Sequence, residues 1–183
     1  MALDKTARVI EPFETARLRL RPIETADAEL LVELDADPEV MRFISGGAPT
    51  PLDEAERIVE RAIGHRWIAY DRSTGELIGW FGLRPSAGRD RELGYRLRRS
   101  AWGKGLATEG SQALIALAFE HLGADRVWAD TMTVNVRSRG VMERCGLQYV
   151  RTFHLEWPEP IEGTEEGDVE YELTKAEWED QRR

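Results

Sequence analysis

The chain of 183 residues contains little of several residue types that define particular protein classes. It has one cysteine, Cys145, and three histidines, which excludes an internal disulfide framework and a metal site built from several cysteines. No apolar run approaches the roughly 20 residues that span a bilayer. The segment Met1–Thr15 lacks the apolar stretch of a secretory signal. We therefore expect a cytoplasmic protein without a membrane partner.

Positive charges are outnumbered by negative charges. The chain has 25 Lys and Arg residues against 34 Asp and Glu residues, a formal net charge of −9. A nucleic-acid-binding surface needs a dense face of Lys and Arg, so no nucleic-acid partner is expected. The acidic surface could attract cationic amines. It could equally serve solubility alone, and both interpretations stay open.

The remaining composition suits one globular domain. Hydrophobic residues make up 42% of the chain and charged residues 32%, and the length is sufficient for a core of its own. No internal repeat or interdomain linker is visible. We predict a single domain over residues 1–183, with its core at about 14–174 and a short C-terminal tail.

The hydrophobic pattern predicts a mixed α/β (α+β) fold. Alternation of period two indicates strands, and helical spacing with capping residues such as Thr25 and Thr50 indicates helices. The predicted strands are Ala16–Pro22, Arg66–Asp71, Glu76–Leu83, Glu92–Arg98, Asp125–Thr133, Tyr149–Trp157 and Val169–Leu173. The predicted helices include Glu54–Ile63, Ala107–Leu122 and Ser138–Arg144.

The order of these elements predicts the sheet. Short turns join three strands between Arg66 and Arg98, which implies an antiparallel meander. The strand–helix–strand order from Glu92 to Thr133 requires two parallel strands joined by a crossover helix. The sheet should therefore be mixed, with helices on both faces.

A glycine-bearing turn lies between the third meander strand and the longest helix. It reads Trp102-Gly-Lys-Gly-Leu-Ala-Thr108. Glycines let a backbone approach a ligand closely, and the first turn of a helix presents free N–H groups that bind anions such as a pyrophosphate. Lys104 could add a positive charge. The spacing is neither that of a Walker A loop nor that of a dinucleotide fingerprint, so a simple tight turn remains an alternative.

Other segments extend the pattern beyond this turn. Glu92-Leu-Gly-Tyr-Arg-Leu97, Gly103-Lys-Gly-Leu-Ala-Thr-Glu109, Asn135-x-x-Ser138 and Gly146-Leu147 together resemble the GNAT acetyltransferase superfamily. The stretches Glu14–Ile23 and Asp35–Phe43 resemble its RimJ/RimL-like branch. The resemblance covers about Glu14 to Leu173. Trp102 departs from the family's Gln/Arg at that position, as is common in this branch.

This resemblance implies a splayed sheet with acetyl-CoA in the gap between the strands Glu92–Arg98 and Asp125–Thr133. The backbone of Tyr95, Arg96 and Leu97 would pair with the pantetheine arm, and Asn135 would lie near it. Trp102 would flank the cofactor. The pyrophosphate would be held by the backbone of Gly103, Lys104, Gly105, Leu106, Ala107 and Thr108. No metal is implied.

The resemblance also implies the reaction. A neutral primary amine, on a protein N-terminus, an amino acid or a small molecule, would attack the thioester directly. Glu92 or Asp130 would act as the base that accepts the amine proton. The alternative for each is a solvated or salt-bridged strand residue. Phe43 and Trp80 could wall the acceptor site.

Many members of the family use a tyrosine seven residues after the asparagine as proton donor for the departing thiolate. This chain has Met142 there, which cannot donate a proton. Ser138 is the substitute that the resemblance offers. It could instead cap the helix that follows Asn135, since Ser is favoured at that position. Both roles stay open.

Four other side chains have weaker claims. Arg137 and Arg139 could contact the cofactor phosphates, and His154 could contribute to the acceptor pocket. Cys145 is expected to be a small buried residue rather than a nucleophile.

Two rival functions stay open beside acetyl transfer. One is a non-catalytic acyl-CoA-binding module, and the other is a nucleotide-phosphate enzyme that uses the glycine turn. The chain is expected to be a monomer or a homodimer.

Overall fold

A computed structural model describes residues 11–183 of the chain. The segment 1–10, where the sequence predicts no secretory signal, lies outside the described residues. The strands of the single sheet are β1 (Phe13–Glu14), β2 (Leu18–Pro22), β3 (Arg66–Asp71), β4 (Leu77–Pro85), β5 (Arg91–Leu97), β6 (Arg126–Met132), β7 (Gln148–Phe153) and β8 (Asp168–Thr174). The α-helices are α1 (Ala28–Asp35), α2 (Pro38–Ser45), α3 (Leu52–Ala62), α4 (Leu106–Glu120), α5 (Val136–Arg144) and α6 (Lys175–Asp180).

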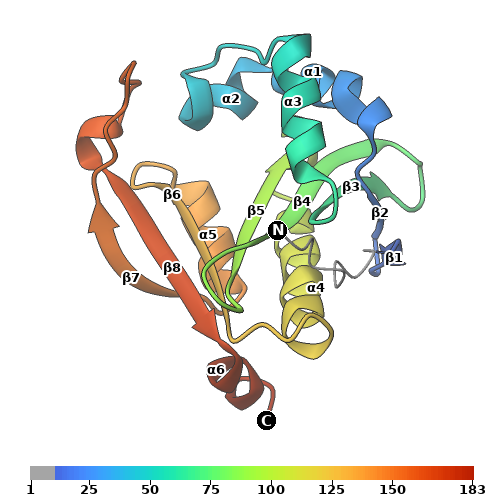
Figure 1. Cartoon of the computed structure of the whole chain (residues 1–183), viewed down its shortest axis with the longest axis vertical. Coiled ribbons are helices and arrows are strands. Elements are labelled where there is room, and N and C mark those ends of the chain that lie inside the picture. The colour runs from blue at the N-terminus through green and yellow to red at the C-terminus, as the bar shows by residue number, and fades with distance from the viewer. Residues whose placement is uncertain (1–10) are drawn as a thin grey trace, which may run out of the picture.

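The sheet consists of two antiparallel halves that meet at one parallel contact. Its strand order is β1-β2-β3-β4-β5-β6-β8-β7. Strands β5 and β6 pair only at Arg91↔Val127 and Glu92↔Trp128. Beyond these pairs the two strands diverge toward α2 (Figure 1). The predicted mixed, splayed sheet is confirmed.

Alternation along the strands creates a hydrophobic core on each face of the larger half. Trp67 and Phe81 are buried in the core that includes Leu114 and Ile115 of α4. Ile68, the neighbour of Trp67, lies in the second core, which is formed with α1, α2 and α3. Side chains of successive strand residues point to opposite faces, so helices cover both faces as predicted.

A buried ion pair ties the layer of α1 to the sheet. Asp35, at the end of α1, is fully buried. Both of its oxygens lie 2.7 Å from Nη1 of Arg96 on β5. Thr50 Oγ1 donates to Asp35 Oδ2 at 2.6 Å. The prediction that Thr50 caps α3 is therefore wrong, because Pro51 occupies the N-cap position and the Thr50 hydroxyl points inward to Asp35.

Three further boundaries differ from the sequence prediction. Thr25 does not cap α1, because it lies in a 3₁₀ turn that Glu24 precedes and α1 begins only at Ala28. Strand β7 ends at Phe153 rather than Trp157. Its pairing with β8 ends there, with the pair Phe153↔Asp168. The short C-terminal tail contains helix α6, whose first turn is closed by a capping box between Thr174 and Glu177.

Removing the Asp35 carboxylate should strongly destabilise the fold. The substitution Asp35→Ala leaves Arg96 charged and largely buried without its partner, a change that typically costs about 3–5 kcal/mol. The measurement is the free energy of unfolding from urea titration followed by fluorescence. Asp53→Ala, which breaks an exposed ion pair with Arg57, is the control and should change it by less than about 1 kcal/mol. Similar small losses in both variants would contradict the anchoring role of Asp35.

Candidate active site

A cleft of about 820 Å³ occupies the space where β5 and β6 diverge. Its walls come from β5, β6 and α5, together with α2 and residues of the segment between β7 and β8. Its volume is within the range of small-molecule sites. The predicted site residues that line it are Glu92, Tyr95, Arg96, Leu97, Trp102, Ala107, Asp130, Asn135 and Ser138. Phe43 and Trp80, predicted as acceptor-site walls, line it as well.

The glycine turn has the backbone that an anion site requires. Gly103 and Gly105 have φ values of +71° and +75°, a region that side chains disfavour. Gly105 is the N-cap of α4 and forms no side-chain cap. The first N–H groups of α4 therefore lack a capping partner and are available to a ligand. The Leu106 side chain is buried in the core, so only its backbone is available to a ligand.

The N-terminal segment braces this turn from outside. Arg17 Nε lies 2.6 Å from Glu109 Oε2 in the first turn of α4, and its Nη1 donates to the Lys104 carbonyl at 2.7 Å. Thr15 Oγ1 donates to the other oxygen of Glu109 at 2.6 Å. One guanidinium thus holds both the glycine turn and the start of α4.

Trp102 connects the turn to both walls of the cleft. Its indole Nε1 donates to the Leu97 carbonyl at 2.9 Å, so that carbonyl already has a donor. The Arg137 guanidinium of α5 lies 4.9 Å from the centre of the Trp102 ring. Arg139 is engaged elsewhere, since it donates to the Thr133 carbonyl and to the Tyr171 hydroxyl.

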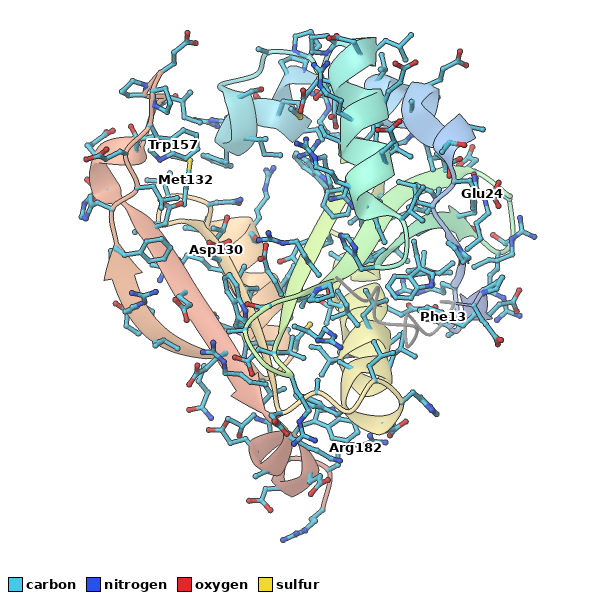
Figure 2. The ribbon with its side chains drawn as sticks, viewed as in Figure 1. Phe13, Glu24, Asp130, Met132, Trp157 and Arg182 are labelled. Carbon is cyan, nitrogen blue, oxygen red and sulfur yellow. The ribbon has the colours of Figure 1, made fainter. Side chains whose placement is uncertain are left out.

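The two candidate bases have different surroundings. Glu92 forms an ion pair with Arg84 on the neighbouring strand. Asp130 on β6 lies beside the gap between the sheet halves (Figure 2) and has no ion-pair partner among residues 11–183. Although Asp130 is exposed at the cleft surface, the protein around its carboxyl reduces hydration and raises its pKa to about 6, with a further contribution from the charge of Glu92.

A tyrosine hydroxyl that the sequence analysis did not identify lies deep in the cleft. Tyr95 Oη is 2.9 Å from Ser138 Oγ and donates to the Ser138 carbonyl at 3.1 Å. Burial raises the pKa of Tyr95, so the phenol keeps its proton at neutral pH. The two residues are 43 positions apart, and no local pattern in the sequence signals this contact.

The structure also resolves the capping alternative for Ser138. Asn135 is the N-cap of α5, and its Oδ1 accepts the Ser138 N–H at 3.3 Å. The Asn135 Nδ2 group donates to Thr131 Oγ1 at 3.0 Å. Ser138 therefore does not cap α5, and its hydroxyl is directed to Tyr95 instead.

Met142 is buried in the core and also lines the cleft, where it cannot donate a proton. Cys145 and His154 do not line the cleft. Cys145 is buried too, as predicted, and burial raises the pKa of its thiol to about 12, which opposes a nucleophilic role. His154 lies just after β7, is exposed, and contacts the Glu165 carbonyl at 3.3 Å. It is therefore outside the strand on which the sequence placed it.

Other features of residues 11–183 do not compete with this cleft. A smaller hollow of about 530 Å³ is lined from α4, α5 and α6 and contains none of the predicted site residues. Within the same range, no helix has the length and apolar character to cross a membrane. Groups of three or more metal-type side chains are likewise not found there.

Sequence comparisons relate the chain to acetyltransferases. A family model described as an acetyltransferase (GNAT) domain matches residues 17–148. The chain is 36% identical over 194 aligned positions to the FsC-acetyl coenzyme A-N(2)-transacetylase of Aspergillus fumigatus, covering 94% of this chain and 80% of that protein.

Solved structures share the fold. A spermidine N-acetyltransferase from Vibrio cholerae, crystallised with CoA and spermine, superposes with a TM-score of 0.76 at 19% identity, over 90% of this chain and 99% of the other. A proposed ribosomal-protein-serine acetyltransferase from the same organism gives a TM-score of 0.71 at 22% identity, over 91% and 98% of the two chains. The family match, the splayed sheet and the glycine turn together establish that this chain belongs to the GNAT family of acetyl-CoA-dependent acetyltransferases.

Proposed function

We propose that this enzyme acetylates the primary amine of a small cationic acceptor, with Asp130 as the general base. The observation that carries the proposal is the carboxylate of Asp130, which lines the cleft without an ion-pair partner and has a pKa of about 6. A base with a pKa near the working pH is effective in proton transfer. An ammonium bound at this carboxylate can give up its proton there before attack.

The cleft fits acetyl-CoA, which supplies the acetyl group as a thioester. Residues Leu93–Leu97 of β5 have no strand partner on the side facing β6, so their backbone can pair with the pantetheine arm. The N–H groups of residues 103–108 can hold the pyrophosphate at the start of α4. Asn135 and Trp102 line the cleft as well.

Asp130 is better placed than Glu92 for the role of base. The Arg84 guanidinium forms an ion pair with Glu92, which makes the Glu92 oxygens less available to an ammonium. Glu92 still contributes, because its negative charge helps to raise the pKa of Asp130. We therefore assign Asp130 as the base and Glu92 as a residue that tunes it.

The pair of Tyr95 and Ser138 is the proton donor that we assign for the sulfur. The Tyr95 hydroxyl remains protonated at neutral pH because burial raises its pKa. Ser138 Oγ lies within hydrogen-bond distance of it and can relay or orient the proton. This pair occupies the role that Met142 cannot fill.

Charge around the cleft supports a cationic acceptor. Its lining contains the carboxylates of Glu39, Glu92, Asp130, Glu162, Glu165, Glu166 and Asp168 against the cations of Arg42, Arg96 and Arg137. The names of two relatives, an N(2)-transacetylase and a spermidine N-acetyltransferase, also refer to amine acceptors. Protein N-termini and amino acids belong to the same chemical class and remain candidate acceptors.

A thiol-release assay with acetyl-CoA and a panel of amines, amino acids and short peptides tests the proposal. Thiol release that depends on a primary amine is expected. Binding of CoA, measured by calorimetry, without release for any amine would instead support a non-catalytic acyl-CoA-binding module. Binding of ATP or NAD with no binding of CoA would contradict acetyl transfer altogether.

The pH dependence of kcat/KM should reflect the ionisation of the Asp130 carboxyl. Its basic form accumulates only above a pH of about 6, so the rate should fall as pH drops through that value. Asp130→Asn should remove this acidic limb and lower kcat/KM at least about 100-fold. The raised pKa means that the fold disfavours the ionised form of Asp130. Asp130→Asn should therefore raise the melting temperature at pH 8, where the carboxyl is ionised, but not at pH 4, where it is already protonated in the folded protein.

Two control variants separate Asp130 from its neighbours in that experiment. Glu92→Gln should keep the limb but move it to lower pH, because the charge that raises the Asp130 pKa is gone. Tyr95→Phe should lower kcat and leave the position of the limb unchanged. An unchanged limb in Asp130→Asn would remove Asp130 from the proposed mechanism.

The brace at Arg17 should affect cofactor binding. Arg17→Ala releases the Lys104 carbonyl and Glu109, so the glycine turn should hold the pyrophosphate less well. We expect the KM for acetyl-CoA to rise about 3- to 10-fold, as for the loss of one partly exposed charged contact, with little change in kcat. Arg19→Ala, an exposed arginine two residues along the chain, is the control. Equal effects of both variants would indicate a general charge effect.

A further inference from the structure

A row of carboxylates runs along one face of β6 and β8. Asp168, Glu170 and Glu172 alternate on β8 and therefore point to the same face. Asp130 of β6 stands opposite Glu170 in the antiparallel register. The row ends at the cleft, whose lining includes Asp130 and Asp168 but not the other two carboxylates.

Arginines form ion pairs only with Glu170 and Glu172, the two carboxylates of this row that do not line the cleft. Arg126 lies 2.6 Å from Glu172, and Arg151 lies 2.7 Å from Glu170. Among residues 11–183, no ion pair reaches Asp130 or Asp168. The protein thus leaves uncompensated the two carboxylates that line the cleft.

Asp168 is the more unusual of the two because it is buried. Only 6% of the residue is exposed, and its Oδ2 atom has no hydrogen-bond partner. Burial raises the pKa of Asp168, while the nearby His154 and the Trp157 indole act in the opposite direction. Trp157 Nε1 also has no hydrogen-bond partner, so this indole does not satisfy the carboxylate. A buried polar group without a partner is costly, and a ligand that donates to it would remove that cost.

Asp168 lies close to Asp130, the proposed base. Asp130 and Asp168 are diagonal neighbours on adjacent strands, with Cα atoms about 7–8 Å apart. In Figure 2, Asp130, Met132 and Trp157 follow one another toward the start of β8, where Asp168 lies. The two carboxylates therefore suit two cationic groups at the ends of a short chain.

We propose that Asp168 is a specificity-determining residue that binds the distal ammonium of a diamine acceptor, while Asp130 receives the reacting amine. This inference rests on the proposed amine acetylation and adds the chemical class of the acceptor. The chemistry that it requires is a second cationic nitrogen a few methylene groups from the first. A monoamine of the same length would leave Asp168 unsatisfied.

Calorimetric titration of the enzyme–CoA complex tests this assignment without turnover. Pentane-1,5-diamine should bind about 10-fold or more tightly than n-pentylamine, as expected for one charge-assisted hydrogen bond. In Asp168→Asn the preference should disappear through weaker diamine binding, with monoamine affinity unchanged. Glu172→Gln removes one negative charge from the same strand face and should keep the preference.

Several results would overturn the inference. These are equal affinities of the two amines for the native enzyme, a preference that persists in Asp168→Asn, or an equal loss in Glu172→Gln. If Asp168→Asn does not fold, as judged by its melting curve, a comparison in the native enzyme decides. Pentane-1,5-diamine should then bind more tightly than 5-aminopentan-1-ol, which has the same length but no second positive charge, and equal affinities would contradict the site.

Failure of the Asp168 subsite can be distinguished from failure of the proposed acetyl transfer. Asp168-dependent diamine binding without thiol release would contradict acetyl transfer and leave the subsite in place. Equally efficient acetylation of diamine and monoamine would support acetyl transfer and contradict the subsite.

Discussion

Backbone pairing between β5 and β6 stops after two residue pairs, and the rest of the site depends on that interruption. On the side facing β6, the last five residues of β5 have peptide groups without a strand partner. A continuous sheet would fill this space with a ladder of hydrogen bonds and leave no room for a ligand. Glu92 stands at the last pair, so the cleft begins where the ladder ends.

The two helical layers hold the sheet halves around this opening. On one face, the ion pair between Asp35 and Arg96 attaches α1 to the strand that borders the cleft. On the other face, α4 packs on β4 and β5. Gly110 makes that packing close, because a Cβ atom there would lie 2.3 Å from the Phe81 ring. The start of α4, with its free N–H groups, is thereby held at the mouth of the cleft.

The carboxylates that hold elements of the fold together have arginine partners. Glu109 and Glu170 have arginine partners at 2.6 and 2.7 Å, and Asp35 has both a guanidinium and a hydroxyl. Asp130 and Asp168, which line the cleft, have no such partner in the described part of the chain. Under the proposed function, a cationic substrate would supply the positive charge that these two carboxylates lack.

The sequence by itself determined the order of elements, the mixed sheet, the glycine turn and the strands that border the cleft, with a minority of the residues that line it. These features follow from local alternation, from the crossover that parallel strands require, and from the residue types of short segments. Only the tertiary structure decided the contacts of individual side chains. Arg84 forms an ion pair with Glu92 and not with Asp130, Asn135 rather than Ser138 caps α5, and Tyr95 meets Ser138 across 43 residues. The first two contacts depend on which of several nearby side chains turns toward the partner, and the third joins residues far apart in the chain, so none of them follows from a local sequence pattern.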